Sequence, residues 1–412
     1  MKMQVSNLIT CVSCAVLFIL FMCIPVSYAQ ISVSFASYIS SKIVNPNTEL
    51  VNGQRNFEQD LEVKVSALQD ENKQDTVEQK SSGLAYFPVL GYSPETKTMI
   101  GGGASYFFRE PGSDVTSRPS TITPLLIYTQ KKQIISILGV DLYWKDEIYH
   151  LNGNFAFVKF PDFFYGIGNN TPEEAEEDYT PRNTMFTLKF QKKMLHGMYV
   201  GIQYMYGTSK LVEVEENGLL AQGDILGSES GAVSGAGVLM NWDTRNNIFF
   251  PSSGSFYQLS TFFVNSALGS DYDYNRYNLD LRQYFPLTSS QVLAFHGYIN
   301  ILTGDPPFQL MSQLAGENVM RGYYQGRYRD KDIVAFQMEY RSPVKRRFGL
   351  VGFAGFGGVA NKIRNFELKR FKQCYGFGIR FLISPDEKLN LRLDFGFGKG
   401  SSGMYLNLGE AF

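Results

Sequence analysis

Three arginines in one short stretch carry the most evident chemistry in this sequence. Arg321, Arg327 and Arg329 are interspersed with glycines and tyrosines, namely Gly322, Tyr323, Tyr324, Gly326 and Tyr328. A guanidinium is planar, permanently charged and matched to carboxylate geometry, so a buried arginine needs acidic partners to offset its lost hydration. The residue types therefore predict a loop that is held in place by ion pairs.

The stretch that follows this loop has two faces of opposite character. Apolar and polar side chains alternate through residues 333–341, and a period of two predicts a strand. The apolar positions are Val334, Phe336, Met338 and Tyr340, and the polar ones are Gln337, Glu339 and Arg341. An apolar outside and a charged inside suit a membrane barrel with a polar lumen. We expect the arginine loop to fold into that lumen.

Similar alternation recurs through most of the chain, which predicts an all-β protein, a 16-stranded antiparallel transmembrane β-barrel of the outer membrane. Connections after even-numbered strands are mostly tight, whereas three connections after odd-numbered strands are long (161–181, 212–229 and 304–332). Short turns on one side and long loops on the other are typical of outer-membrane barrels, with the short side periplasmic. The predicted strands are 85–93, 98–109, 120–130, 133–144, 147–160, 182–193, 197–211, 230–242, 255–265, 272–285, 290–303, 333–342, 347–360, 371–383, 388–399 and 403–412.

The alternation is clearest near the end of the chain, where it fixes which residues face inward. Leu391, Leu393 and Phe395 face one way, and Arg392 and Asp394 face the other. A slip of one residue would place a cation in lipid at a cost of roughly 2–4 kcal/mol, so the register is determined. Asp394 and Glu339 are therefore the candidate partners of Arg321 inside the lumen.

The N-terminal part of the chain predicts export. Residues 1–29 have Lys2, an apolar stretch and a small-x-small end at Ala29, which indicates a secretory signal peptide; a retained anchor helix is the alternative. Residues 30–83 are polar and charged with few aromatics, which predicts a disordered periplasmic segment. Residues 84–412 form the predicted barrel domain.

Several other kinds of chemistry find little support in the sequence. The three histidines, His150, His196 and His296, lie in no nucleophile or metalloprotease motif, so we expect no catalytic residue and no enzyme activity. Cys374 is the single cysteine after the signal peptide, so no cysteine metal cluster or intramolecular disulfide is expected, and no cofactor is indicated. A net charge of -1 disfavours nucleic acid as a partner.

Four motifs resemble one known family, and they occur in that family's order. Met320-Arg321-Gly322-Tyr323 is similar to the (V/I/M)-R-G-(F/Y) signature of the sixth extracellular loop in BamA/TamA-type outer-membrane proteins, the bacterial surface antigen family. Asp243, Arg245, Pro251 and Gly254 match its D-x-R-D-N-x-x-F-P-x-x-G periplasmic turn, with Asn246 at the second aspartate. Tyr92-Ser93-Pro94-Glu95-Thr96 resembles its opening hairpin, with Lys97 in place of glycine. The end of the chain resembles its closing strand, with Phe412 as the terminal strand signal.

The resemblance implies a function in assisting the insertion or translocation of polypeptides, or of lipid, at the outer membrane. The alternative is a stand-alone pore or surface antigen, because residues 30–83 are too short and too polar for one of the family's periplasmic POTRA domains. Outer-membrane lipid, client polypeptides and a periplasmic protein are the implied partners. In the family an F-x-D-x-G strand supplies one acidic contact of the loop arginine, and here Gly355 stands in place of that aspartate.

The seam between the first and last strands is where the resemblance places the mechanism. Pro88 removes a backbone donor from the first strand, and Gly400, Gly403 and Gly409 weaken the last. Their pairing is therefore expected to be poorer than elsewhere, so that an incoming strand can add to the exposed edge.

Overall fold

The computed structural model of the chain describes residues 82–112, 118–316, 318–384 and 388–412. The predicted signal peptide and nearly all of the predicted polar segment lie outside these residues. Ser82 and Gly83, which we had assigned to the end of that segment, belong to the first strand instead. None of the helices in the described ranges is long and apolar enough to cross a membrane.

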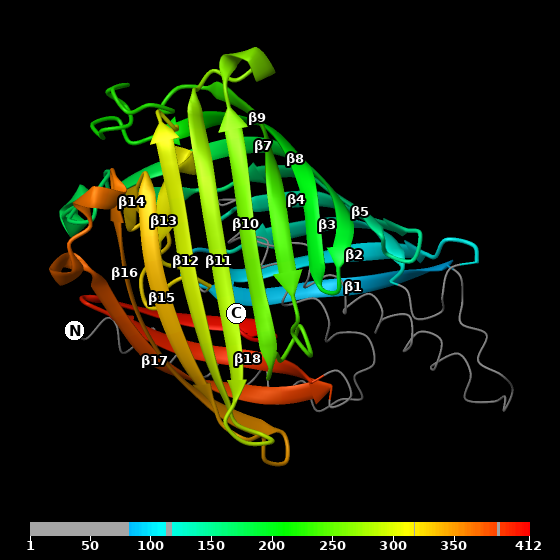
Figure 1. Cartoon of the computed structure of the whole chain (residues 1–412). Helices are drawn as coiled ribbons and strands as arrows, with labels where there is room; N and C mark the ends of the chain where they lie inside the picture. Colours follow the sequence, from blue (N-terminus) through cyan, green and yellow to red (C-terminus); the bar gives the residue numbers. More distant parts are fainter. Residues whose placement is uncertain (1–81, 113–117, 317, 385–387) are drawn as a thin grey trace, which may run out of the picture.

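Sixteen long antiparallel strands form one closed barrel, which confirms the predicted fold (Figure 1). Consecutive strands pair around the ring, and the last strand returns to the first. Their bounds are β1 (Ser82–Ser93), β2 (Lys97–Phe108), β3 (Ser120–Thr129), β4 (Ile134–Trp144), β5 (Tyr149–Lys159), β7 (Glu177–Leu195), β8 (Met198–Val214), β9 (Gly231–Asp243), β10 (Gly254–Val264), β11 (Tyr274–Pro286), β12 (Val292–Gly304), β15 (Asp332–Arg341), β16 (Phe348–Ala360), β17 (Lys372–Ser384), β18 (Leu389–Gly398) and β19 (Ser401–Leu408).

Short elements in the long loops were not predicted from the sequence. The three-residue strand β6 (Asp162–Phe164) extends the barrel sheet along the start of β7. Strands β13 (Ser312–Leu314) and β14 (Tyr328–Asp330) pair with each other as a separate ribbon inside the loop between β12 and β15. The 3-10 helices are η1 (Glu173–Ala175), η2 (Ser266–Leu268), η3 (Phe308–Leu310), η4 (Ile363–Asn365) and η5 (Leu368–Arg370).

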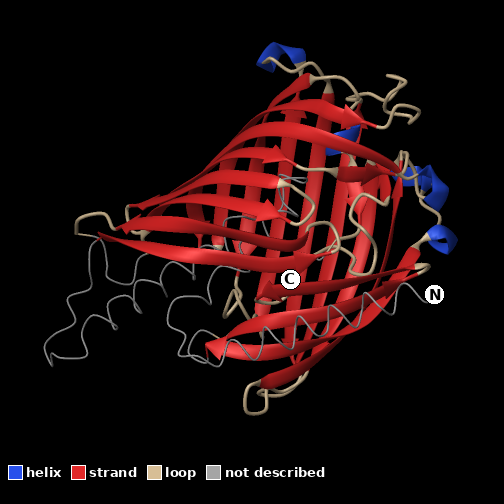
Figure 2. Cartoon of the chain, turned by 180° about the vertical axis from the view of Figure 1, so that it is seen from behind, coloured by secondary structure: helices blue, strands red, loops and turns tan. Residues whose placement is uncertain are grey.

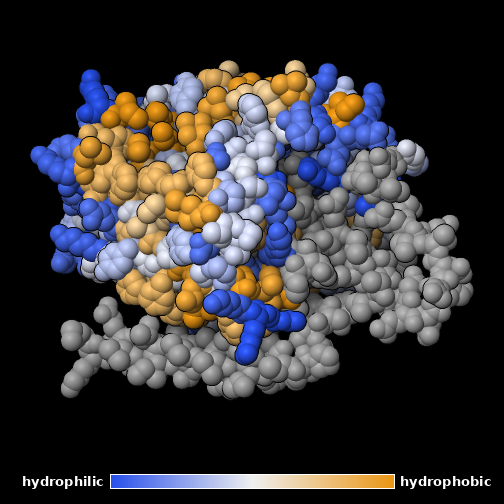
Figure 3. Space-filling view, turned by 60° about the horizontal axis from the view of Figure 1, so that its bottom comes forward, coloured by the Kyte–Doolittle hydropathy of each residue, from blue (hydrophilic) through white to orange (hydrophobic). Residues whose placement is uncertain are grey.

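The two faces of the wall have the predicted chemistry. On β15, Met338 and Tyr340 are exposed on the outside, whereas Gln337 and Glu339 are buried on the inside. Hydrophobic side chains gather over the outer surface of the barrel (Figure 3). The buried charged side chains of the wall include Arg276, Asp280, Arg341, Arg380, Arg392 and Asp394. This distribution is the reverse of a soluble protein and fits a barrel surrounded by lipid.

The predicted end of the last strand is wrong. The strand was expected to run to Phe412, but β19 ends at Leu408. Gly409 has a positive φ of 74°, which turns the chain away from the wall, and its amide donates to the Asn390 carbonyl at 2.8 Å. The following residues are buried, with Phe412 only 4% exposed.

The start of β7 was also placed too late in the chain. We expected this strand to begin at residue 182, and it begins at Glu177 because β6 pairs with its first residues. Such an extension beyond the membrane carries no lipid-facing alternation, so the pattern that identifies the other strands does not mark it.

An arginine introduced on the outer face should reveal the depth of each position in the membrane. Phe336 lies in the middle of β15 and Phe348 at the start of β16, both facing outward. Phe336→Arg should destabilise the folded barrel by about 2–4 kcal/mol, and Phe348→Arg by at most about 1 kcal/mol. Urea unfolding of barrels folded into phospholipid vesicles measures both values; equal costs would contradict the assigned lipid-facing band.

Candidate functional site

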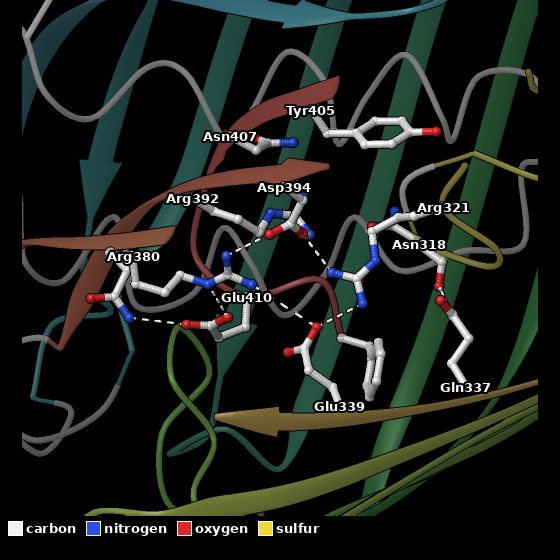
Figure 4. Close-up of polar contacts among 12 residues, drawn as sticks. Asn318, Arg321, Gln337, Glu339, Arg380, Arg392, Asp394, Tyr405, Asn407 and Glu410 are labelled. Atoms are coloured by element: carbon white, nitrogen blue, oxygen red, sulfur yellow. Dashed lines mark hydrogen bonds and ion pairs between the residues drawn. The ribbon is translucent and has the colours of Figure 1, made fainter. Parts of the chain in front are cut away.

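Arg321 is fully buried in the lumen between two carboxylates from β15 and β18, strands that are separated in the wall by β16 and β17 (Figure 4). Its Nη1 donates to Asp394 Oδ2 on β18 at 2.5 Å, and its Nη2 donates to Glu339 Oε2 on β15 at 2.7 Å. Both carboxylates are likewise 0% exposed. The structure thus brings together the loop arginine and both candidate partners, and one planar guanidinium bridges them.

The stretch that lacks the family's aspartate contributes an aromatic ring to the site instead. Phe353 on β16 lies beneath Arg321, with 3.5 Å between the guanidinium carbon and the ring centroid. A cation over an aromatic face is stabilised further when both are desolvated. The stretch 353–357 therefore contributes a ring to Arg321, while the second acid comes from β18.

Glycines allow the loop backbone to lie directly on the wall. Gly322 has φ +110°, and a Cβ there would approach the backbone of Gly396 and Phe397 to 2.8–3.0 Å. The reverse contact is equally close, because a Cβ on Gly396 would lie 2.7 Å from the Gly322 nitrogen. Only a residue without a side chain fits on each side of this contact. The backbone therefore sets the depth of Arg321.

Hydrogen bonds of Tyr323 and Tyr405 connect the same turn to β17, β18 and β19. The amide of Gly322 donates to the Tyr405 hydroxyl on β19 at 3.0 Å. The Tyr323 hydroxyl donates to the Gln373 carbonyl on β17 at 2.8 Å and accepts from the Lys399 amide at 2.9 Å. The predicted loop-lock motif, Arg321, Gly322 and Tyr323, therefore contacts β15, β17, β18 and β19 at once.

The ion pairs of Arg321 belong to a larger buried cluster. Arg380 on β17 donates to Asp394 at 2.5 Å and to Glu410 at 2.7 Å. Arg341 on β15 donates through Nε to Glu339 at 2.9 Å. Side chains of the cluster are at most 2% exposed, and its charged members are Arg321, Arg341, Arg380, Arg392, Glu339, Asp394 and Glu410.

The sequence analysis had placed Arg392 inward, but it had assigned neither Arg392 nor Arg380 to the site. Facing strands bring Gly378 opposite Asp394, and a Cβ at Gly378 would lie 2.0 Å from Asp394 Oδ1. Glu410 was missed because it had been assigned to a strand that continues along the wall. The alternation of β17 contained the signal for Arg380, whereas the entry of Glu410 into the lumen depends on the turn at Gly409.

The periplasmic turn motif is ordered by its own side chains. Arg245 donates from Nε and Nη2 to the two oxygens of Asp243, at 2.9 and 2.7 Å. Gly254 has φ +91°, and a Cβ there would collide with the Thr244 carbonyl at 2.1 Å. The carbonyl of Pro251 accepts from Arg341 Nη1 at 2.9 Å. The turn is therefore joined to the Arg321 cluster through Arg341.

Phe412 lies in the lumen beside this turn and not in the wall. Its carbonyl accepts from Arg341 Nη2 at 2.8 Å, and its ring lies 5.1 Å from that of His296. Phe250 from the periplasmic turn packs against the buried cluster that contains Phe412 and Tyr284. The position predicted to be a strand signal thus forms part of the contact between the periplasmic turn and the end of the chain.

The extracellular end of the arginine loop is held by a second set of contacts. Arg327 donates to the Thr171 hydroxyl at 2.8 Å, and Arg329 is fully buried with Nη1 donating to the Phe308 carbonyl at 3.3 Å. The Tyr324 hydroxyl donates to Asp162 at 2.8 Å. Burial raises the pKa of Asp162, and nearby Arg329 opposes that shift. The loop therefore spans the lumen, from Asp394 on β18 to Asp162 on β6.

The opening hairpin motif also contacts this loop. Glu95 is buried, and its carboxylate accepts from the Gln325 amide at 3.1 Å. The Ser93 and Thr96 hydroxyls hydrogen-bond to each other at 2.9 Å and so close the turn. Lys97 stands in the family's glycine position with φ +57°.

His150, His296 and Cys374 are buried against neighbouring side chains of the wall and the loop. His150 pairs with Asp141 and stacks on Tyr143 at 4.4 Å between centroids, and His296 lies 3.1 Å from Asp280. Cys374 is buried under the arginine loop. In the described ranges, no group of three or more His, Cys, Asp or Glu side chains has a metal-binding arrangement.

The fold and the filled lumen define an outer-membrane β-barrel. Residues 125–412 match the model of the Omp85 superfamily domain, so the chain belongs to the Omp85 superfamily. Barrels of this superfamily act in insertion and translocation at the outer membrane, with client polypeptides and partner proteins. Comparison with curated proteins finds no significant match.

Solved structures of this superfamily share the fold at low sequence identity. BamA from Haemophilus ducreyi lacking POTRA domains 1-3 superposes with a TM-score of 0.58 at 15% identity, over 80% of this chain and 70% of that one. CdiB from Acinetobacter baumannii gives 0.51 at 12% identity, over 80% of this chain and 60% of that one. CdiB from Escherichia coli gives 0.51 at 10% identity, over 89% and 73%.

Removing the guanidinium of Arg321 should release the loop without unfolding the barrel. Arg321→Ala leaves Glu339 with Arg341 and Asp394 with Arg380, so the wall keeps its ion pairs while the loop loses its own, and the cost should stay below the roughly 3–5 kcal/mol of an uncompensated buried charge. Ion conductance in planar bilayers should rise. Arg321→Lys should restore little, because an ammonium lacks the planar fork.

Arg327→Ala is the matched control, since that guanidinium donates to the neutral Thr171 at the other end of the loop. It should change conductance far less. Wild-type protein that already conducts as an open pore, unchanged by Arg321→Ala, would contradict the closure of the lumen by this loop.

Gly322→Ala should disturb the same contact without removing a charge. The new Cβ meets backbone atoms of β18 that have no free rotation, and φ +110° is strained for alanine. Gly316→Ala has a comparable positive φ of 92° but meets the movable Gln325 side chain at 3.2 Å. Conductance should therefore rise with Gly322→Ala and change little with Gly316→Ala; equal effects would mean that backbone strain alone is responsible.

Proposed function

We propose that this barrel assists insertion or translocation of polypeptides at the outer membrane by offering the seam between β1 and β19 to an incoming strand. The observation that carries the proposal is the pairing at that seam. β1 and β19 share the single residue pair Tyr92↔Leu406. By contrast, β18 and β19 pair without interruption from Leu391↔Leu408 to Gly398↔Ser401. The seam is therefore the weakest line of hydrogen bonds around the ring.

Local sequence supports this weakness. Pro88 lies within β1 and has no amide hydrogen to donate. Gly409 turns the chain inward after Leu408, so the last strand is too short to follow β1 to its beginning. Unpaired backbone groups on an edge strand are a template for β-augmentation. A client strand would satisfy those groups where the barrel itself leaves them unpaired.

The Arg321 cluster would keep the lumen closed while the seam opens. Its contacts connect the loop to β15, β17, β18 and β19, all on one side of the seam. We infer that this group of strands moves as one body and that β1 separates from it. The buried ion pairs are then retained in both states. Clients and a periplasmic protein are the partners that such a mechanism requires.

Locking the seam by a disulfide tests the proposal. Tyr92→Cys with Leu406→Cys, in a Cys374→Ser background, places two thiols at the one paired position. The oxidised barrel should keep its heat-modifiable folded form, yet fail to support the other outer-membrane proteins of a strain depleted of wild-type protein. Reduction should restore their assembly.

Leu393→Cys with Leu406→Cys is the matched control, because it joins β18 to β19 where they already pair. It should leave assembly unchanged. Full activity of the locked seam would contradict lateral opening. No effect of depletion on any other outer-membrane protein, together with raised conductance in Arg321→Ala, would favour a stand-alone pore instead.

A further inference from the structure

The connection between β16 and β17 lies at the edge of the barrel and combines exposed basic residues with exposed apolar ones. We call residues 361–371 the rim segment; it contains η4 and η5. Opposite views of the barrel place these helices at the outer edge of the molecule (Figures 1 and 2). The segment follows the thirteenth long strand of the ring, so it lies at the extracellular end with the other long loops.

Aromatic contacts attach the rim segment to the lipid-facing side of the wall. Phe371 lies 6.1 Å from Phe356, and Phe366 lies 5.8 Å from Phe371, measured between ring centroids. A Cβ on Gly358 would lie 3.3 Å from the Phe371 ring. Phe356 is 44% exposed on the outer face. The aromatic surface of the barrel therefore continues without interruption into this segment.

The rim segment presents both apolar and basic groups to its surroundings. Leu368 is 80% exposed and Ile363 is 53% exposed. Four exposed cations, Lys362, Arg364, Lys369 and Arg370, accompany them. The one carboxylate of the segment, Glu367, pairs with Lys369 and Arg370 at 3.1 and 3.2 Å. Exposed apolar side chains among cations are typical of a surface that meets anionic lipid.

A cleft of about 390 Å³ lies between the rim segment and the loop after β6. Its polar lining includes amides, a hydroxyl, a carboxylate and one guanidinium, from Asn169, Thr171, Asn361, Asn365, Glu367 and Arg370. Such groups donate to and accept from sugar hydroxyls, and the rings of Phe366 and Phe371 offer apolar faces beside them. Arg370 belongs to both the cleft and the basic surface.

We propose that the rim segment and this cleft form a binding site for the phosphorylated saccharide headgroup of an outer-leaflet glycolipid. The cations contact its phosphates, the cleft receives a sugar, and Ile363 and Leu368 contact its acyl chains. This assignment requires the outer-membrane location of the barrel and is independent of how the seam acts. Charge complementarity selects the occupant, because the segment carries four cations and one carboxylate in a chain of net charge -1.

Titration of the purified full chain in non-ionic detergent with bisphosphorylated lipid A tests the site, with bound lipid counted by native mass spectrometry. Arg364→Gln with Lys369→Gln and Arg370→Gln should weaken binding by about tenfold or more. The matched control is Lys345→Gln with Arg346→Gln and Arg347→Gln, which removes three exposed cations from the turn at the opposite end of the barrel. Equal losses in the two triple variants would overturn the site.

Two further titrations test recognition of the headgroup itself. Dephosphorylated lipid A should bind as weakly to the wild type as the bisphosphorylated form binds to the rim variant. Asn361→Ala with Asn365→Ala should lower the preference for lipid A over phosphatidylglycerol while leaving phosphatidylglycerol binding unchanged. Equal binding of the two lipids to the wild type would overturn the role of the cleft. Heat-modifiable mobility confirms that each variant is folded.

Discussion

The interior of this barrel depends on the placement of one desolvated guanidinium. Arg321 can be buried completely because Glu339 and Asp394 approach it from two different strands and Phe353 covers one of its faces. Leaving either carboxylate buried without a cation would be strongly unfavourable, so the wall supplies Arg341 and Arg380 as additional partners. The loop therefore depends on the wall more than the wall depends on the loop: Arg321 needs these two acids, whereas each acid keeps a second cation.

Through Arg341 this dependence extends to the periplasmic mouth. Arg341 donates to Glu339, to the Pro251 carbonyl of the periplasmic turn and to the Phe412 carbonyl. One side chain thus connects the extracellular loop, the periplasmic turn and the end of the chain. Three motifs that are far apart in the sequence meet in one hydrogen-bonded group. The loop motif, the periplasmic turn motif and the end of the chain therefore form one connected site.

Sequence reasoning identified the wall because lipid imposes alternation on every membrane-spanning strand. It therefore placed Glu339 and Asp394 inside, and it limited the acids available to Arg321 to these two. It could not show that one guanidinium reaches both, since that depends on the depth set by the Gly322 and Gly396 contact. Alternation likewise carries no information after Gly409, where the chain leaves the wall, and so Glu410 and Phe412 were misplaced.

The asymmetry of β19 gives the strongest link between this interior and the proposed activity. On one side it pairs continuously with β18, and its Tyr405 hydroxyl accepts a hydrogen bond from the Gly322 amide of the arginine loop. On the other side it meets β1 at one residue pair. A force that separates the wall will break the line with fewest hydrogen bonds, and that line is the seam. Because the contacts of Arg321, Gly322 and Tyr323 lie on the retained side, β1 can part from β19 without exposing the buried charges of the Arg321 cluster.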